Sequence, residues 1–279
     1  MKYFVTNIRK TMKMLIFSAM LIPRLLANLQ CSDEASSVSR YHLTEKCHRS
    51  KLGIVAYANY TSLTSCQRLG LEKKGLAINF SPPEARKVGM EHSCEVMNCA
   101  ETDGGLSLKN DTRYDYYTLY ARPVPDKNST CVPTIGMFRL LPQKLNYTEA
   151  VEQCRNISGV LADITTDQRT DSLGQLLAGS GNEAAFVGLR RSNGSVFKNS
   201  RGTTLDCITY RAWAPGHPRR NSTKFECVLI SRQKTWLSSA CSKRYPALCE
   251  LNPGGPYKKG SIFTSEKRNG SLTNIIYRK

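Results

Sequence analysis

Cysteine is the residue type through which this chain could do the most chemistry. In an exported protein a large set of cysteines forms structural disulfides. The number here is odd, so at least one thiol stays free or pairs with another chain. Zinc binding by His92, Cys94 and Cys99 is disfavoured, because oxidised cysteines cannot ligate zinc. The eleven cysteines are Cys31, Cys47, Cys66, Cys94, Cys99, Cys131, Cys154, Cys207, Cys227, Cys241 and Cys249.

The sequence shows none of the residue patterns that are typical of enzymes. It has four histidines and contains no His-Glu-x-x-His, no Gly-x-Ser-x-Gly and no phosphate-binding loop. His217 and Asp206 resemble a base and its carboxylate partner, but no nucleophile stands beside them. We therefore expect a protein with no catalytic residues, no metal site and no cofactor.

Asparagine offers a second kind of chemistry, the attachment of N-linked glycans. Only about three Asn-x-Ser/Thr sequons would arise by chance in a chain of this composition, and nine are present. The excess predicts a glycoprotein. The acceptors are Asn59, Asn79, Asn110, Asn128, Asn146, Asn156, Asn193, Asn221 and Asn269.

The N-terminus predicts export. Arg9, Lys10 and Lys13 precede a short apolar run over 14–22, and Ala27 is a small residue near a cleavage point. The run is shorter than the roughly 20 apolar residues that span a bilayer. We interpret residues 1–30 as a signal peptide and expect a secreted, extracellular protein with no membrane span. An uncleaved anchor is the alternative.

The charge balance indicates the kind of partner. The net charge is +18, and the first 30 residues carry five of the positive charges, which leaves a mature chain near +13. Outside the cell this favours sulfated or sialylated glycans, anionic lipid or acidic proteins, and nucleic acid is not an expected partner. The alternative is an ordinary solvated basic surface that serves solubility.

Residues 31–122 must form a small module that positions the first group of cysteines and sequons. A helix is predicted over 61–74, with Leu63, Cys66 and Leu69 on one side and Gly75 at its end. Alternation predicts strands over 76–80, 94–99 and 113–120.

A helix that carries a cysteine, followed by strands with further cysteines, resembles the PAN/apple module. That resemblance implies a disulfide between Cys66 and Cys94, and a second between Cys47 and Cys99. It rests on spacing and a loose pattern over about 80 residues. An unclassified, cysteine-rich α+β module is the alternative.

A Pro-rich stretch, 123–130, is predicted to be an extended linker before a second module at residues 131–251. In that module Asn146 and Glu149 predict a capping box at the start of a helix that carries Cys154. A second helix is predicted from about Thr166. Residues 252–279 form a basic tail that we expect to be disordered.

The order of motifs in the second module resembles the C-type lectin-like domain. The resemblance implies an α+β, double-loop fold with disulfides Cys154–Cys249 and Cys227–Cys241, and makes Phe186, Val187, Leu189, Trp213 and Trp236 core residues. The motifs are Cys154 followed by Leu-Ala-Asp-Ile at 161–164, Phe-Val-Gly-Leu at 186–189, Trp-Ala-Pro-Gly-His-Pro at 213–218, Cys-Val at 227–228, Trp236, and Cys241 before Leu-Cys-Glu at 248–250.

In sugar-binding members of that family, calcium is held by a Glu-Pro-Asn or Gln-Pro-Asp tripeptide, an acidic residue two before the loop cysteine, and Asn-Asp after the late tryptophan. Calcium prefers six to eight oxygen ligands, several of them carboxylates. All five ligand positions are changed, so we expect the calcium site to be lost. Without the ion we also expect a looser loop or a trans bond before Pro218. The replacements are His217 and Arg219 around Pro218, then Phe225, Leu237 and Ser238.

The loop instead offers His217, Arg219, Arg220 and Lys224 as candidate ligand-binding residues, with Arg190, Arg191 and Arg201 elsewhere in the module. Basic side chains bind sulfate or carboxylate; the alternative is a solvated basic face. We therefore expect calcium-independent recognition of a protein or glycan, with a lectin for acidic glycans as the alternative. Cys207 is the first candidate for an unpaired thiol, and with it a disulfide-linked dimer.

Overall fold

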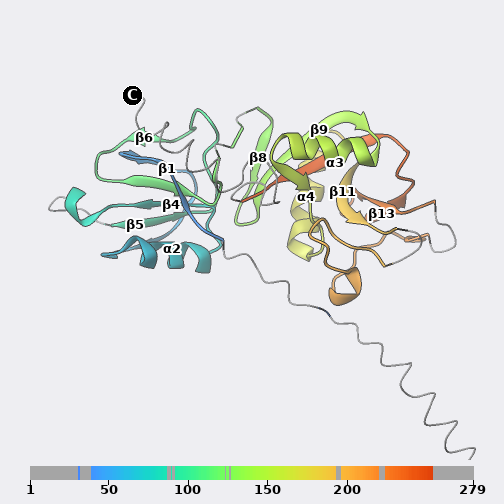
Figure 1. Ribbon diagram of the computed structural model, residues 1–279, viewed down its shortest axis with the longest axis horizontal. Helices are drawn as coiled ribbons and strands as arrows, with labels where there is room; N and C mark the ends of the chain where they lie inside the picture. Colours follow the sequence, from blue (N-terminus) through green and yellow to red (C-terminus); the bar gives the residue numbers. More distant parts are fainter. Residues whose placement is uncertain are drawn as a thin grey trace, which may run out of the picture. The chain divides into compact units, whose positions relative to one another are not determined.

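The computed structural model describes residues 31, 39–86, 89, 92–122, 124–125, 127–192, 196–219 and 224–253 (Figure 1). The predicted signal peptide and all but the first two residues of the predicted basic tail lie outside the described residues, as do Asn193, Arg220, Asn221 and Asn269. Among the helices of the described part, none is long and apolar enough to cross a membrane.

The N-terminal half is built on a five-stranded antiparallel sheet with the order β1-β7-β4-β5-β3. Helix α2 (Leu63–Glu72) packs along β4 and β5 on one side of this sheet (Figure 1). Strands β2 and β6 form a separate ribbon. The elements are β1 (His42–Glu45), β2 (His48–Arg49), β3 (Ile54–Ala58), β4 (Ala77–Phe80), a 3-10 turn (Pro83–Ala85), β5 (Cys94–Met97), β6 (Lys109–Asn110) and β7 (Asp115–Thr118).

Helix α2 lies close to its predicted bounds. Ser62 caps the first turn, because its side chain accepts a backbone hydrogen bond there. Gly70 faces the sheet, and a Cβ at this position would lie 2.5 Å from Oη of Tyr41, so a larger residue would force a shift. The helix ends at Glu72, two residues before its predicted last residue, and Lys74 then enters the left-handed region with φ 52°.

The central strands β4 and β5 do not show the predicted alternation, because all of their residues are buried. On the face toward α2, Ile78 and Val96 belong to the apolar core. On the other face Asn79 and Glu95 are fully buried and hydrogen-bonded to each other. The edge-side strand β7 keeps the alternation. Burial of polar groups in the middle of the sheet requires that they be paired.

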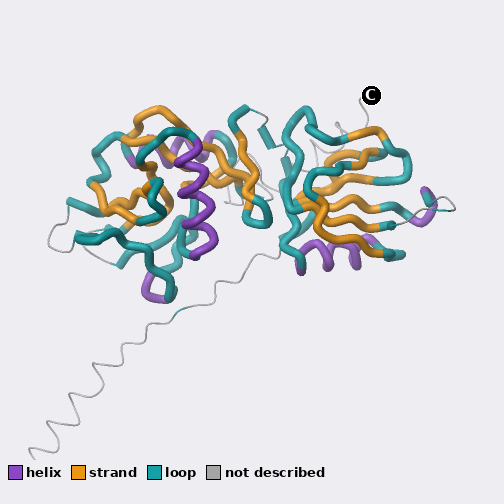
Figure 2. Tube along the Cα trace, turned by 180° about the vertical axis from the view of Figure 1, so that it is seen from behind, coloured by secondary structure: helices purple, strands orange, loops and turns teal. Residues whose placement is uncertain are grey.

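The C-terminal half is a mixed sheet with the order β13-β12-β11-β14-β9-β8, in which β10 also pairs with β14. Helices α3 (Tyr147–Asn156) and α4 (Asp167–Gly179) pack against it (Figure 2). The predicted capping box is present: Asn146 accepts from N of Glu149, and Glu149 accepts from N of Asn146. The remaining elements are β8 (Ser129–Val132), β9 (Gly136–Leu145), β10 (Gly159–Leu161), β11 (Ala184–Arg190), a 3-10 turn (Leu205–Cys207), β12 (Cys227–Ser231), β13 (Trp236–Ser239) and β14 (Tyr245–Leu251).

The core residues predicted for the second module occupy the core. Phe186, Val187, Leu189 and Trp236 are buried. Trp213 is partly buried and packs edge-on against Trp236, with ring centroids 5.4 Å apart. These side chains form the apolar core of this half.

The segment predicted to be a linker, 123–130, is not a free spacer. Val124 is 3% exposed and pairs with Thr102, and its carbonyl accepts from N of Asp103 at 2.6 Å. Strand β8 already begins at Ser129. Apolar burial of Val124 outweighs the tendency of the flanking prolines to keep the chain extended and solvated. Residues of both halves therefore share one apolar cluster, to which Met137 also belongs.

The disulfides tie helices to strands and one half to the other. Cys66–Cys94, Cys154–Cys249 and Cys227–Cys241 are present, which are three of the pairs implied by the resemblances. The expected Cys47–Cys99 pair is wrong, because Cys99 bonds to Cys131 across the predicted module boundary. Cys207 is also disulfide-bonded, so it is not the unpaired thiol. Among the described residues the free cysteine is Cys47, which is exposed.

Candidate binding site in the long loop

The loop between β11 and β12 carries the basic residues singled out in the sequence. Its base is fixed by aromatic packing, since Trp213 contacts Phe197 and Trp236 at centroid distances of 5.1 and 5.4 Å. The main chain of Ala214 donates to the carbonyl of Trp236 at 3.0 Å. These contacts hold residues 213 and 214 against β13, and the turn that carries His217 begins directly after them.

His217 is hydrogen-bonded directly to strand β13. Its Nδ1 accepts from the backbone N of Ser238 at 2.8 Å and lies 3.0 Å from Oγ of the same residue. This Oγ also accepts from the backbone N of Arg219 at 3.0 Å. A backbone N–H can only donate, so Nδ1 carries no proton and the neutral imidazole holds its proton on Nε2. One imidazole and one hydroxyl thus join two main-chain segments.

The protonation of His217 is disfavoured by its surroundings. Burial and, secondarily, the charge of Arg219 lower the pKa of His217 below its ordinary value of 6.5. Both effects act against the imidazolium form. The neutral ring that the hydrogen bonds require is therefore also the form that the local electrostatics favour at neutral pH.

The peptide bond between His217 and Pro218 is cis, so the expectation of a trans bond or a looser loop is wrong. The residues on both sides of Pro218 bond to Ser238, which holds the turn against β13. No local pattern predicts this contact, because Ser238 lies 21 residues from His217.

Arg219 is an exposed cation in the turn that follows Pro218. Its guanidinium carbon lies 4.7 Å from the centroid of the Phe225 ring. Its carbonyl accepts from Nη2 of Arg191 at 3.0 Å. Lys224, also exposed, directly precedes Phe225, whereas the fourth predicted ligand-binding residue, Arg220, lies outside the described residues. The structure thus brings His217, Arg219 and Phe225 to one turn.

The arginines expected elsewhere on the basic face have other neighbours. Arg190 lies over the ring of Tyr147 at 5.5 Å. Arg201 lies 3.7 Å from the carboxylate of Glu250. Arg191 is 9% exposed and supports the loop through the main chain. The candidate site therefore includes fewer of the basic residues than the sequence analysis considered.

Comparison with known proteins bears on the segment that holds this loop. Residues 143–251 match the family model described as the lectin C-type domain. This segment is a C-type lectin-like domain. Similar solved structures are human lithostathine (17% identity, TM-score 0.40, 45% of this chain and 89% of that chain), the carbohydrate-recognition domain of the mouse scavenger receptor C-type lectin (18%, 0.41, 48% and 99%) and a calcium-independent type II antifreeze protein (20%, 0.37, 45% and 92%). None of these similarities identifies a ligand for this chain.

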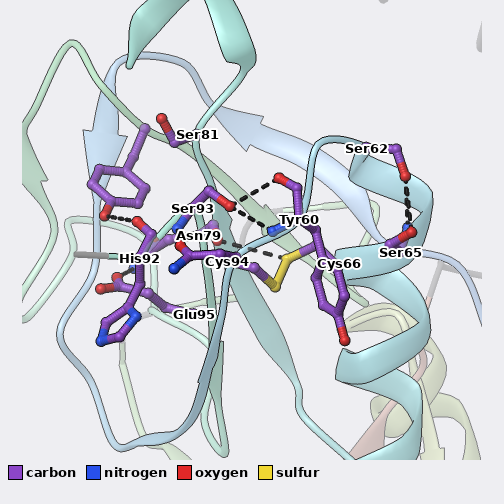
Figure 3. The surroundings of a disulfide bond; sticks show 12 residues. Tyr60, Ser62, Ser65, Cys66, Asn79, Ser81, His92, Ser93, Cys94 and Glu95 are labelled. Carbon is purple, nitrogen blue, oxygen red and sulfur yellow. Dashed lines mark hydrogen bonds between the residues drawn. A yellow bond between two sulfur atoms is a disulfide. The ribbon is translucent and has the colours of Figure 1, made fainter. Parts of the chain in front are cut away.

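The N-terminal half lies outside the matched segment. Helix α2 is tied to β5 by the Cys66–Cys94 disulfide, a pair that the PAN/apple resemblance implies (Figure 3). Membership of that family remains a prediction.

The residues at the five calcium-ligand positions of the lectin-like domain do not fit a calcium ion. Only Ser238 offers a side-chain oxygen there, and that oxygen already bonds to the turn. Calcium needs six to eight oxygens, with carboxylates among them. The guanidinium of Arg219 would repel a cation, and the ring of Phe225 faces Arg219. Within the described ranges, groups of three or more His, Cys, Asp or Glu that could hold a metal ion are absent.

The predicted glycosylation acceptors differ in their exposure. Asn146 is partly buried, and its Oδ1 accepts a hydrogen bond in the cap of α3, while three further acceptors lie outside the described residues. The exposed acceptors are Asn59, Asn110, Asn128 and Asn156. Glycosylation at these four positions stays a prediction with which their exposure agrees.

A glycan on Asn79 is incompatible with the structure. Its side chain is fully buried. Oδ1 accepts from N of Ser50 at 3.0 Å, and Nδ2 donates to the carbonyl of Ser50 at 2.7 Å and to Glu95 at 2.8 Å. Figure 3 shows Asn79 and Glu95 beside the Cys66–Cys94 disulfide. The structure contradicts the prediction of Asn79 as a glycosylation acceptor. The sequon contains no local signal of burial, because the burial depends on the tertiary structure.

Proposed function

We propose that this protein is a secreted, non-catalytic recognition protein whose C-type lectin-like domain binds a protein or glycan ligand without calcium. The observation that carries the proposal is the direct hydrogen bonding of His217 to Ser238. Both residues stand where the family's calcium ligands are expected. The protein thus bonds to itself across the positions that a calcium ion would bridge.

Export is part of the proposal. Oxidised cysteines in both halves support it, because structural disulfides persist in oxidising compartments. The basic and apolar start of the sequence supports it as well.

A lectin for acidic glycans is a second candidate, favoured by the setting of Arg219. Its guanidinium lies against the ring of Phe225, so it is oriented before a ligand arrives. A guanidinium binds sulfate or carboxylate through two parallel hydrogen bonds. The high net positive charge would raise the rate of encounter with such glycans.

A glycan-array screen of the secreted protein tests both candidates. We expect any binding to survive a calcium chelator, and the melting temperature to be unchanged when calcium is added or removed. Binding that disappears in chelator would overturn the proposal that the domain binds its ligand without calcium. Binding to sulfated or sialylated glycans that weakens with salt would support the acidic-glycan candidate.

Two exposed arginines provide the matched comparison. Arg219→Gln should abolish binding to acidic glycans, because it removes the guanidinium in the turn that follows Pro218. Arg232→Gln should leave binding unchanged, because Arg232 lies in the turn between β12 and β13 and pairs with Glu183 at 3.0 Å. Equal losses in the two variants would indicate attraction by net charge instead of a site. Absence of glycan binding under all conditions would leave a protein ligand.

A further inference from the structure

The turn that carries Arg219 is fastened to β13 by an acceptor that acid can remove. Nδ1 of His217 accepts from N of Ser238 at 2.8 Å and lies 3.0 Å from its Oγ. A protonated Nδ1 has no lone pair, so it can accept neither bond. The Ser238 hydroxyl can rotate to accept the new N–H, but the Ser238 backbone N–H would then face another donor.

The charges around His217 add to this effect. Arg219, two residues away, is the charged group that acts on the ring, and a second positive charge on His217 would repel it. Strand β13 contributes the uncharged Ser238 at this contact. Arg191 follows β11 and adds another cation, which donates to the carbonyl of Arg219. Among the described residues, these groups from the loop, from β13 and from the end of β11 are cationic or uncharged, so they do not stabilise an imidazolium.

We propose that His217 is a pH-sensitive latch: protonation at Nδ1 in mildly acidic solution releases the turn at 214–219 from β13. The turn is held at neutral pH and freed in acid. Because the same turn presents Arg219, the latch would release a ligand bound there in an acidic compartment. That consequence rests on the proposed function, whereas the latch itself does not.

The pH window follows from the direction of the pKa shift. The folded pKa of His217 lies below the ordinary value of 6.5, so the unfolded or released state binds the proton more readily. The contribution of the latch is fully present above pH 6.5 and is lost as the pH falls through the lowered pKa. The change therefore lies on the acidic side of neutrality, where histidine acts as a switch.

Nuclear magnetic resonance of the full chain without ligand tests the latch. At neutral pH we expect His217 as the tautomer protonated on Nε2, with the Ser238 amide protected from hydrogen exchange. Between about pH 7.5 and about pH 5, protection of this amide should fall at least tenfold after correction for the intrinsic exchange rate. The amide of Ile230 on the neighbouring strand β12 should keep its protection and serves as the control.

The variant His217→Asn sharpens the test. Its Oδ1 can accept from Ser238 in place of Nδ1 and takes no proton in this range, so protection should become independent of pH. A His217 tautomer protonated on Nδ1 at neutral pH, or equal Ser238 protection at both pH values in the wild type, would overturn the latch. These readings need no ligand, so a failed ligand screen leaves them unaffected, and a failed latch leaves calcium-independent binding intact.

Discussion

Replacement of Asn79 by aspartate is expected to destabilise the N-terminal half strongly. The Asn79 amide donates to the carbonyl of Ser50 and to Glu95, and both Asn79 and Glu95 are fully buried. Aspartate cannot donate when it is ionised, so the carbonyl of Ser50 loses its side-chain donor, and Glu95 loses one donor while it keeps its bonds to Arg49. Each such loss costs about 1–3 kcal/mol. The new carboxylate would also face that of Glu95, so we expect a total loss of about 3–5 kcal/mol in the free energy of unfolding.

Asn59→Asp is the matched control. Asn59 is exposed, and its Oδ1 accepts from N of Ser93 at 3.0 Å, a bond that aspartate keeps. We expect this variant to change the free energy of unfolding by less than about 0.5 kcal/mol. Both variants lose a sequon, so their comparison separates burial from the loss of a glycan.

The measurement must report on the correct half of the chain. Both tryptophans, Trp213 and Trp236, lie in the C-terminal half, so their fluorescence is not suitable. Hydrogen exchange of β4 and β5, together with calorimetric unfolding, reports on the N-terminal sheet directly. Equal stability of the two variants would refute the buried network, and so would a glycopeptide from the folded, secreted protein that carries a glycan on Asn79.

Three further predictions concern covalent bonds and buried charge. Removal of the Cys154–Cys249 disulfide, which spans a sequence separation of 95, should lower the free energy of unfolding by about 4–5 kcal/mol. Urea unfolding followed by tryptophan fluorescence measures this loss. A loss under about 1 kcal/mol would contradict the expectation. In the folded protein a thiol reagent should label Cys47, and labelling that persists in Cys47→Ser would show this assignment to be wrong. Arg169→Met should lower the free energy of unfolding by about 3–5 kcal/mol, because it leaves the carboxylate of Glu250, 7% exposed, without its bidentate partner. Thermal unfolding at neutral pH measures this, and an unchanged melting temperature would show that the pair is unimportant.

Local patterns in the sequence were sufficient for several elements. The Asn146 and Glu149 capping box was visible because its two hydrogen bonds join residues three apart. Helix α2 was predicted within two residues at each end, since its apolar spacing and Gly75 are local signals. The ordered motifs of the C-type lectin-like domain gave its disulfides, because each motif has a fixed place in that fold.

Other features depended on contacts between distant residues. The burial of Asn79 required Ser50, 29 residues away, and no property of the Asn-Phe-Ser sequon reports it. The free thiol was assigned to the wrong cysteine, because disulfide pairing depends on which Cβ atoms the fold brings together. Cys99 reaches Cys131 only because the second half packs onto the core of the first.

The sequence by itself determined which residues stand where the resemblance to the C-type lectin-like domain implies calcium ligands, because the identities of those residues can be read directly. Only the tertiary structure decided which contacts these residues make. It joins His217 to Ser238 and places Arg219 over Phe225. The physical reason is that hydrogen bonds are short and directional. Which donor meets which acceptor across a loop is therefore set by packing of the whole domain and not by the local sequence.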